Sequence, residues 1–232
     1  MDTKDLLERL LATGKELAEQ GKDAAQQGMD FAAEKLGIPE EPGPERDAAI
    51  ARAKKYALAG GLLALLGTSK NGRKVIKVGS VAALGGLAYK VYSDWQKQKG
   101  MESSGEPLGQ LSGPNANERS RNIIKAMIAA AKSDGHIDSL EQGRISENIQ
   151  AAHLGDEASA LLLSEVQKPL DVSEIATLAA SEETAVEIYL ASLMIVDQEN
   201  EQERQYLSDL AGQLKLSQEL REQLDSESLA TT

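Results

Sequence analysis

The sequence predicts an all-α protein, and three observations carry that prediction. Helix-favouring Ala, Leu, Glu, Gln and Lys are abundant, whereas only 3% of the residues are aromatic, so strands have little of their usual material. From residue 118 onward, apolar residues recur at helical spacing. Helix start signals precede many of these periodic stretches. We expect an N-terminal helix, then a glycine-rich basic helical hairpin, then a C-terminal seven-helix bundle.

Charge divides the chain into three blocks. Residues 1–50 carry a net charge of −6, residues 51–100 carry +9, and residues 101–232 carry −15, which together make the formal −12. A basic, apolar block between acidic arms is typical of contact with a membrane surface, and the acidic arms argue against a nucleic-acid partner. The absence of cysteine excludes disulfides and Cys-type zinc sites.

The N-terminal domain, residues 1–37, is expected to be one acidic helix, which a Pro/Glu-rich linker at 38–50 ends. Its inner positions follow a 4-3-4-3 spacing and are mostly small: Leu7, Leu11, Gly14, Ala18, Gly21, Ala25, Gly28 and Ala32. A stripe of small residues lets another helix approach closely, either in a second copy or in the basic block of the same chain. The alternative is a weakly amphipathic arm without a partner.

The basic block, residues 51–99, holds two charge-free apolar runs at 56–67 and 78–89. We predict a membrane-associated hairpin, although each run has twelve residues and a spanning helix needs about 20. The first alternative is a single span over 75–95, with Tyr89, Tyr92 and Trp95 at the interface. The second is a soluble hairpin packed through small residues, which also suit self-association.

A polar linker at 100–117 is expected to separate this hairpin from the bundle at 118–232. The periodicity and the start signals predict seven helices in the bundle, at 118–133, 139–153, 156–167, 172–179, 181–196, 201–214 and 217–226.

Two helix ends of this bundle lead into acidic turns, residues 132–141 and 196–204. Clustered carboxylates are the ligands that hard divalent cations prefer, although neither turn has the spacing of an EF-hand. The same acids also suit helix caps and first turns, with Ser139 and Asn200 as caps. Both interpretations stay open on these residues alone. The two histidines, His136 and His153, are expected to be a solvated loop residue and a helix C-terminal residue.

Residues 129–141, Ala-Ala-Ala-Lys-Ser-Asp-Gly-His-Ile-Asp-Ser-Leu-Glu, together with residues 197–206, resemble the TerB-like fold of tellurite-resistance proteins. The basic block, above all residues 61–67 and 84–95, resembles the YebE-type bacterial subgroup of that family. The resemblance implies a seven-helix bundle, attachment to the bacterial inner membrane and an unknown function.

The resemblance also implies a divalent-metal site, and five residues of this chain match it: Asp134, Asp138, Glu141, Asp197 and Glu203. Oxygen ligands without cysteine favour calcium, magnesium or manganese. We therefore expect a non-enzymatic membrane protein whose bundle faces the cytoplasm and binds a cation or a protein partner, with a role in envelope, tellurite or oxidant stress. The alternatives are a metal-dependent, hydrolase-like enzyme and a soluble helical scaffold.

Overall fold

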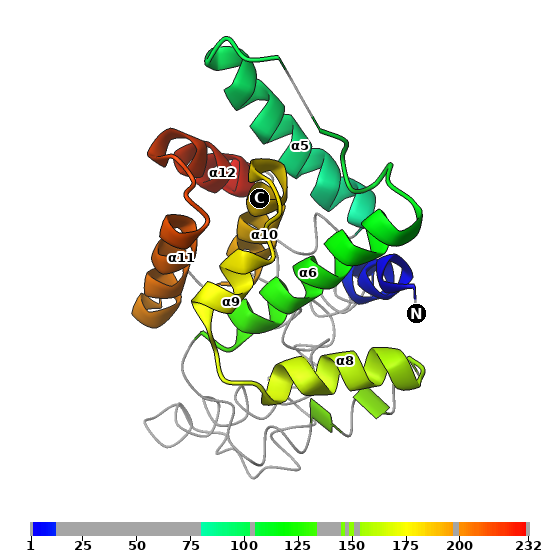
Figure 1. The fold of residues 1–232 in the computed structure, drawn as a ribbon. Coiled ribbons are helices and arrows are strands. Elements are labelled where there is room, and N and C mark those ends of the chain that lie inside the picture. Colours follow the sequence, from blue (N-terminus) through cyan, green and yellow to red (C-terminus); the bar gives the residue numbers. More distant parts are fainter. Residues whose placement is uncertain are drawn as a thin grey trace, which may run out of the picture.

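A computed structural model describes residues 2–12, 80–102, 105–133, 145–146, 149–150, 154–196 and 200–230. Throughout these residues the regular structure is helical, which confirms the predicted all-α class (Figure 1). A helical segment at residues 3–12 is followed by α5 (Val81–Gln98), α6 (Gly113–Ala131), α8 (Asp156–Gln167), α9 (Val172–Thr177), α10 (Glu182–Ile195), α11 (Glu201–Gln213) and α12 (Gln218–Ala230). Further helical residues lie at 145–146 and 149–150.

Side-chain caps set the starts of several helices, including α9, α10 and α11. The Asp171 carboxylate accepts hydrogen bonds from the backbone N–H groups of Ser173 and Glu174, and Asn200 does the same at α11. Ser181 and Thr184 form a reciprocal capping box at the start of α10. These local interactions satisfy backbone donors that have no partner within the helix, so the sequence predicts these starts to within one or two residues.

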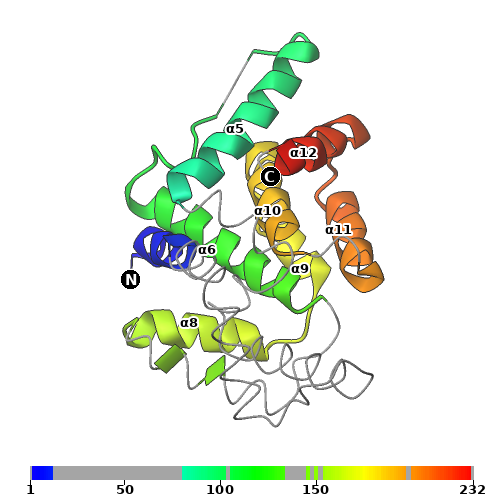
Figure 2. The same ribbon diagram turned by 180° about the vertical axis from the view of Figure 1, so that it is seen from behind.

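Helix α10 is the centre of the fold. All of its residues from Ala185 onward are buried, and α5, α6, α11 and α12 pack around it (Figures 1 and 2). Its neighbours contribute mainly aliphatic side chains, and Tyr189 is the largest fully buried residue among those described. A core of this kind fits a composition that is poor in aromatic residues, because many small apolar contributions must replace a few large ones.

Helix α5 contains most of the second apolar run, and it is a helix of the bundle. It packs against α10 and α12, and Lys90 and Lys99 pair with Glu227 and Glu219 of α12. Trp95 is buried and stacked on Tyr92, so these two residues do not stand at a membrane interface as the single-span alternative requires. No described helix combines the length and the apolar character that crossing a bilayer demands. The first run, at 56–67, lies outside the described residues.

The connection from α5 to α6 is packed rather than extended away from the bundle. Leu108 is fully buried, and its backbone lies directly over Gly85, where an added Cβ atom would come within 2.9 Å of the Leu108 nitrogen. Gly109 in turn lies against Ala82, with its own hypothetical Cβ atom 2.8 Å from the Ala82 Cα atom. Helix α6 begins at Gly113, five residues before the predicted start at 118. Small residues of α5 therefore allow the backbone of the α5–α6 connection to approach the helix closely. The prediction of a linker at 100–117 did not include this contact.

Candidate functional site

Four of the five predicted metal ligands lie outside the described residues: Asp134, Asp138, Glu141 and Asp197, as do His136 and His153. The fifth, Glu203, is half-buried in the first turn of α11, where its backbone N–H donates to the capping oxygen of Asn200 at 3.3 Å. Within the part of the chain that the structure describes, no three His, Cys, Asp or Glu side chains are grouped as a cation site requires. The metal site stays a prediction.

The helices that lead into the two acidic turns end at the same side of the bundle. Arg119, early in α6, pairs with Glu183 and Glu187 in the first half of α10, and these two helices form the most extensive contact among those described. Both views show α6 and α10 running in the same general direction (Figures 1 and 2). Ser133, which follows α6, and Val196, which follows α10, are both buried.

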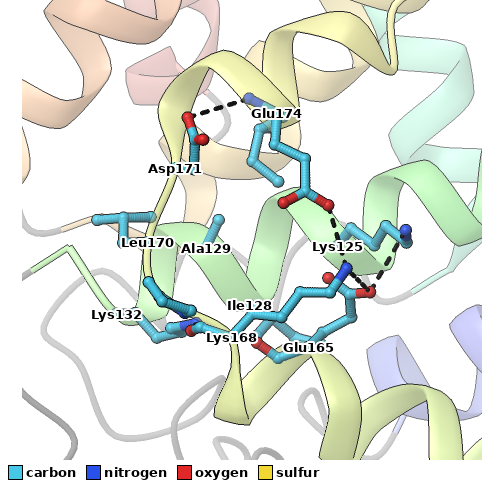
Figure 3. A pocket seen from close by; sticks show the side chains of 11 residues that line it. Lys125, Ile128, Ala129, Lys132, Glu165, Lys168, Leu170, Asp171 and Glu174 are labelled. Atoms are coloured by element: carbon cyan, nitrogen blue, oxygen red, sulfur yellow. Dashed lines mark hydrogen bonds and ion pairs between the residues drawn. The ribbon is translucent and has the colours of Figure 1, made fainter.

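A cluster of lysines lies beside the end of α6 (Figure 3). The Lys132 ammonium group donates to the backbone oxygens of Glu165, at 3.0 Å, and of Lys168. The last carbonyls of a helix have no partner within it, so Lys132 closes the C-terminal end of α8 and joins it to α6. Burial lowers the pKa of Lys132, against the smaller opposing effect of the Glu165 carboxylate.

The Glu165 carboxylate holds two more lysines in this cluster. Lys125 and Lys168 lie 3.3 and 3.1 Å from its Oε1 atom, and Lys168 also reaches Glu174 at 3.1 Å, as the dashed lines in Figure 3 show. The enclosed space of about 20 Å³ has room for roughly one water molecule. The cluster therefore links α6, α8 and α9, and the cavity beside it is too small for a substrate.

A second polar cluster lies at the start of α10. The Arg119 guanidinium binds both oxygens of Glu187, with Nε 2.9 Å from Oε2, and it also contacts Glu183 at 3.1 Å and the backbone oxygen of Glu106 at 3.1 Å. Glu187 is only 2% exposed. Burial raises the pKa of the Glu187 carboxylate, and the ion pair with Arg119 partly offsets that effect.

This arginine cluster joins α6, α10 and the α5–α6 connection, since Gly105 of the connection lies against Glu183 with φ of +102°. No local motif in the sequence marks this cluster. Arg119 and Glu187 are 68 positions apart, and the only local signal is the spacing of four between Glu183 and Glu187. With every guanidinium edge directed at protein oxygens, the cluster supports the fold and offers no free catalytic group.

A wider groove separates the 3–12 helix from the start of α8. This open groove has a volume of about 310 Å³, and its charged lining residues are Asp2, Asp5, Arg9, Asp156 and Glu157. The volume suits a small molecule. The charged part of its lining is mainly acidic. No local pattern in the sequence marks this groove, because it depends on packing between elements about 150 residues apart.

Comparison with known proteins places the chain in a family. A family model described as "Protein of unknown function (DUF533)" matches residues 52–228. The chain is also 31% identical over 111 residues to an "Uncharacterized protein in ampR 5'region" of Yersinia enterocolitica, a match that spans 48% of this chain and 80% of that protein. No solved structure matches the chain. The matched range contains both the basic block and the bundle, and because it spans well over half of the chain, the protein belongs to the DUF533 family.

Proposed function

We propose that the protein is a non-enzymatic, membrane-associated module whose helical bundle presents a binding surface next to the bilayer. The observation that carries this proposal is the position of α5. Its apolar face is buried in the bundle from Val81 onward, so α5 does not present that face to lipid, and we assign lipid contact to the basic stretch before it. Residues 51–79 contain seven Lys or Arg, no Asp or Glu, and the apolar run at 56–67.

The charge of that stretch favours an anionic lipid surface. Each Lys or Arg near such a surface contributes about 1 kcal/mol of binding, and a short apolar run adds burial in the interface. The family resemblance noted in the sequence supports the same proposal, with the bacterial inner membrane as the location and the bundle facing the cytoplasm. A TerB-like role in tellurite or oxidant stress belongs to this proposal as well.

Vesicle co-sedimentation tests the membrane part. The full chain is mixed with vesicles of phosphatidylglycerol and phosphatidylcholine, or of phosphatidylcholine alone. We expect binding to the anionic vesicles that falls at least about tenfold when Lys54, Lys55, Arg73 and Lys74 are changed to Gln. The matched control removes the same number of charges from exposed positions of the described bundle, at Lys97, Arg121, Arg204 and Lys215. Equal binding of both variants, or no preference for anionic lipid, contradicts the proposal.

A second function, divalent-cation binding by the acidic turns, is favoured by the common end of α6 and α10. Two helices that finish at one end of a bundle deliver the stretches after them to the same region. If Asp134, Asp138, Glu141, Asp197 and Glu203 gather there, their mutual repulsion destabilises the fold, and a bound cation relieves it.

Thermal unfolding of the full chain tests the cation. We expect calcium, magnesium or manganese to raise the melting temperature, with a stabilisation of about 2.7 kcal/mol at a hundredfold excess over the dissociation constant. Asp134→Asn with Asp197→Asn removes the rise. The control pair, Asp209→Asn with Glu222→Gln, makes the same charge change on exposed helix positions and leaves it intact. If the ion raises the melting temperature equally in both double variants, the acidic residues act as helix caps and do not bind the ion.

A further inference from the structure

The first residues of the chain are part of the bundle. Leu6, Leu7, Leu10 and Leu11 of the 3–12 helix are each at most 3% exposed and belong to the same core as α5, α6 and α10. Leu7 and Leu11 are the first two positions of the stripe seen in the sequence. The family match begins only at residue 52, so this docked helix lies outside the part of the chain that the family model recognises.

Polar contacts fix where the helix docks. The Glu8 carboxylate accepts a hydrogen bond of 2.7 Å from the backbone N–H of Val81, the first residue of α5. A carboxylate is favourable at this position, because the N-terminal end of a helix has free N–H donors and a partial positive charge. Glu8 thus caps α5 from an element more than 70 positions away, and it supplements the local cap from Ser80.

Two more residues, Lys4 and Thr3, tie the same helix to the α5–α6 connection and the start of α6. The Lys4 ammonium group donates to the backbone oxygens of Gly109, at 3.0 Å, and of Leu111, at 2.6 Å. The Thr3 hydroxyl donates to the Asn117 oxygen at 2.6 Å. Figure 2 shows the 3–12 helix beside the beginnings of both α5 and α6. The start of α5 therefore lies directly against the docked helix, with the Val81 nitrogen 2.7 Å from the Glu8 carboxylate.

We call these contacts of the 3–12 helix with α5 and α6 the clasp. We infer that the clasp keeps the N-terminal helix and the bundle on the same side of a membrane. Residues 13–79 then cross a bilayer an even number of times or not at all. The topological part rests on the proposed membrane association, whereas the clasp itself does not. A single crossing places residues 3–12 and residues 80–230 on opposite sides, and the contacts of Glu8, Lys4 and Thr3 forbid that arrangement.

Cleavage of the intervening stretch tests the clasp without any membrane. A protease site is inserted between Gly43 and Pro44 of the full chain, and the cut protein is weighed by native mass spectrometry. We expect fragments 1–43 and 44–232 to stay together. Leu7→Asp with Leu11→Asp releases the short fragment, and Arg9→Ala, exposed on the same helix, does not. Separation of the fragments in the otherwise unaltered chain overturns the inference, as does equal release from the Leu and Arg variants.

Cysteine labelling tests the topology, since the chain has no cysteine of its own. Asp5→Cys on the N-terminal helix and Glu222→Cys on α12 are both exposed positions, and each is made separately. Spheroplasts are treated with a membrane-impermeant maleimide before and after permeabilisation. We expect the two positions to behave alike, and labelling of one alone overturns the inference. If the protein is absent from the membrane fraction, the proposed function fails while the cleavage experiment still decides the clasp.

Discussion

Gly85 and Gly86 of α5 predict opposite responses to the same substitution. Replacing glycine by alanine inside a helix stabilises it by about 0.8–1.0 kcal/mol, and this gain applies to both positions. At Gly86 an added Cβ atom has no neighbour within 4 Å, so Gly86→Ala keeps the full gain. At Gly85 the Cβ atom comes within 2.9 Å of the Leu108 nitrogen and 3.1 Å of the Gly109 nitrogen.

These two nitrogens are backbone atoms, so the α5–α6 connection must shift to make room for the added Cβ atom. Overpacking of this kind costs about 1–3 kcal/mol. Because the helix-propensity gain is common to both variants, the difference between them isolates the steric cost. For a chain of this size, 1 kcal/mol corresponds to about 2–4 °C in melting temperature. We expect Gly86→Ala to melt above the native protein and Gly85→Ala to melt well below Gly86→Ala.

Thermal unfolding followed by circular dichroism measures this difference. Gly109→Ala tests the same packing from the other side, because its Cβ atom comes within 2.8 Å of the Ala82 Cα atom. We expect Gly109→Ala to destabilise the fold as well. Equal rises in melting temperature for Gly85→Ala and Gly86→Ala would refute the reasoning, since they would show that no backbone lies over Gly85 and that α5 is not packed in this way.

Three further predictions follow from buried polar groups. Arg119→Ala should lower the free energy of unfolding by about 3–5 kcal/mol in urea titrations, because it leaves Glu187 as a buried charge without its partner; adding Glu187→Gln should recover part of the loss. Lys132→Ala should cost about 1–3 kcal/mol by freeing two carbonyl oxygens at the end of α8, whereas Lys97→Ala, exposed on α5, should cost little. Burial raises the pKa of Tyr206 to about 12, so the folded protein retains a proton that the unfolded chain releases near pH 10. Stability should therefore fall as the pH rises from about 10 toward 12, and Tyr206→Phe should reduce that loss in alkaline unfolding curves.

The all-α class and most helix boundaries of the bundle followed from local signals. Asp171, Ser181 and Asn200 cap helices through atoms two or three residues away, so their effect is contained within a short stretch of sequence. The predicted helices at 156–167, 181–196 and 201–214 agree with α8, α10 and α11 to within one residue at each end. These helices have an apolar periodicity long enough to be unambiguous.

The candidate site was less predictable. The acidic turns were recognised by their residue types, but helix first turns and metal sites use the same carboxylates, so composition alone does not separate them. The Arg119 cluster and the groove beside the 3–12 helix carried no comparable signal. Each brings together residues from helices that are far apart in the chain, and only the packing of those helices makes them neighbours.

The sequence by itself determined where helices form, where many of them begin, and that a strongly basic stretch precedes the bundle. Only the tertiary structure decided what α5 packs against. An apolar run with small residues is equally suited to lipid and to another helix, because both offer an apolar surface. The spacing of the apolar residues is the same in the two cases and does not distinguish them. The contacts of Leu108 with Gly85, of Glu8 with Val81 and of Tyr92 with Glu182 settle that α5 belongs to the bundle. All three join residues too distant in sequence for a local pattern to reveal.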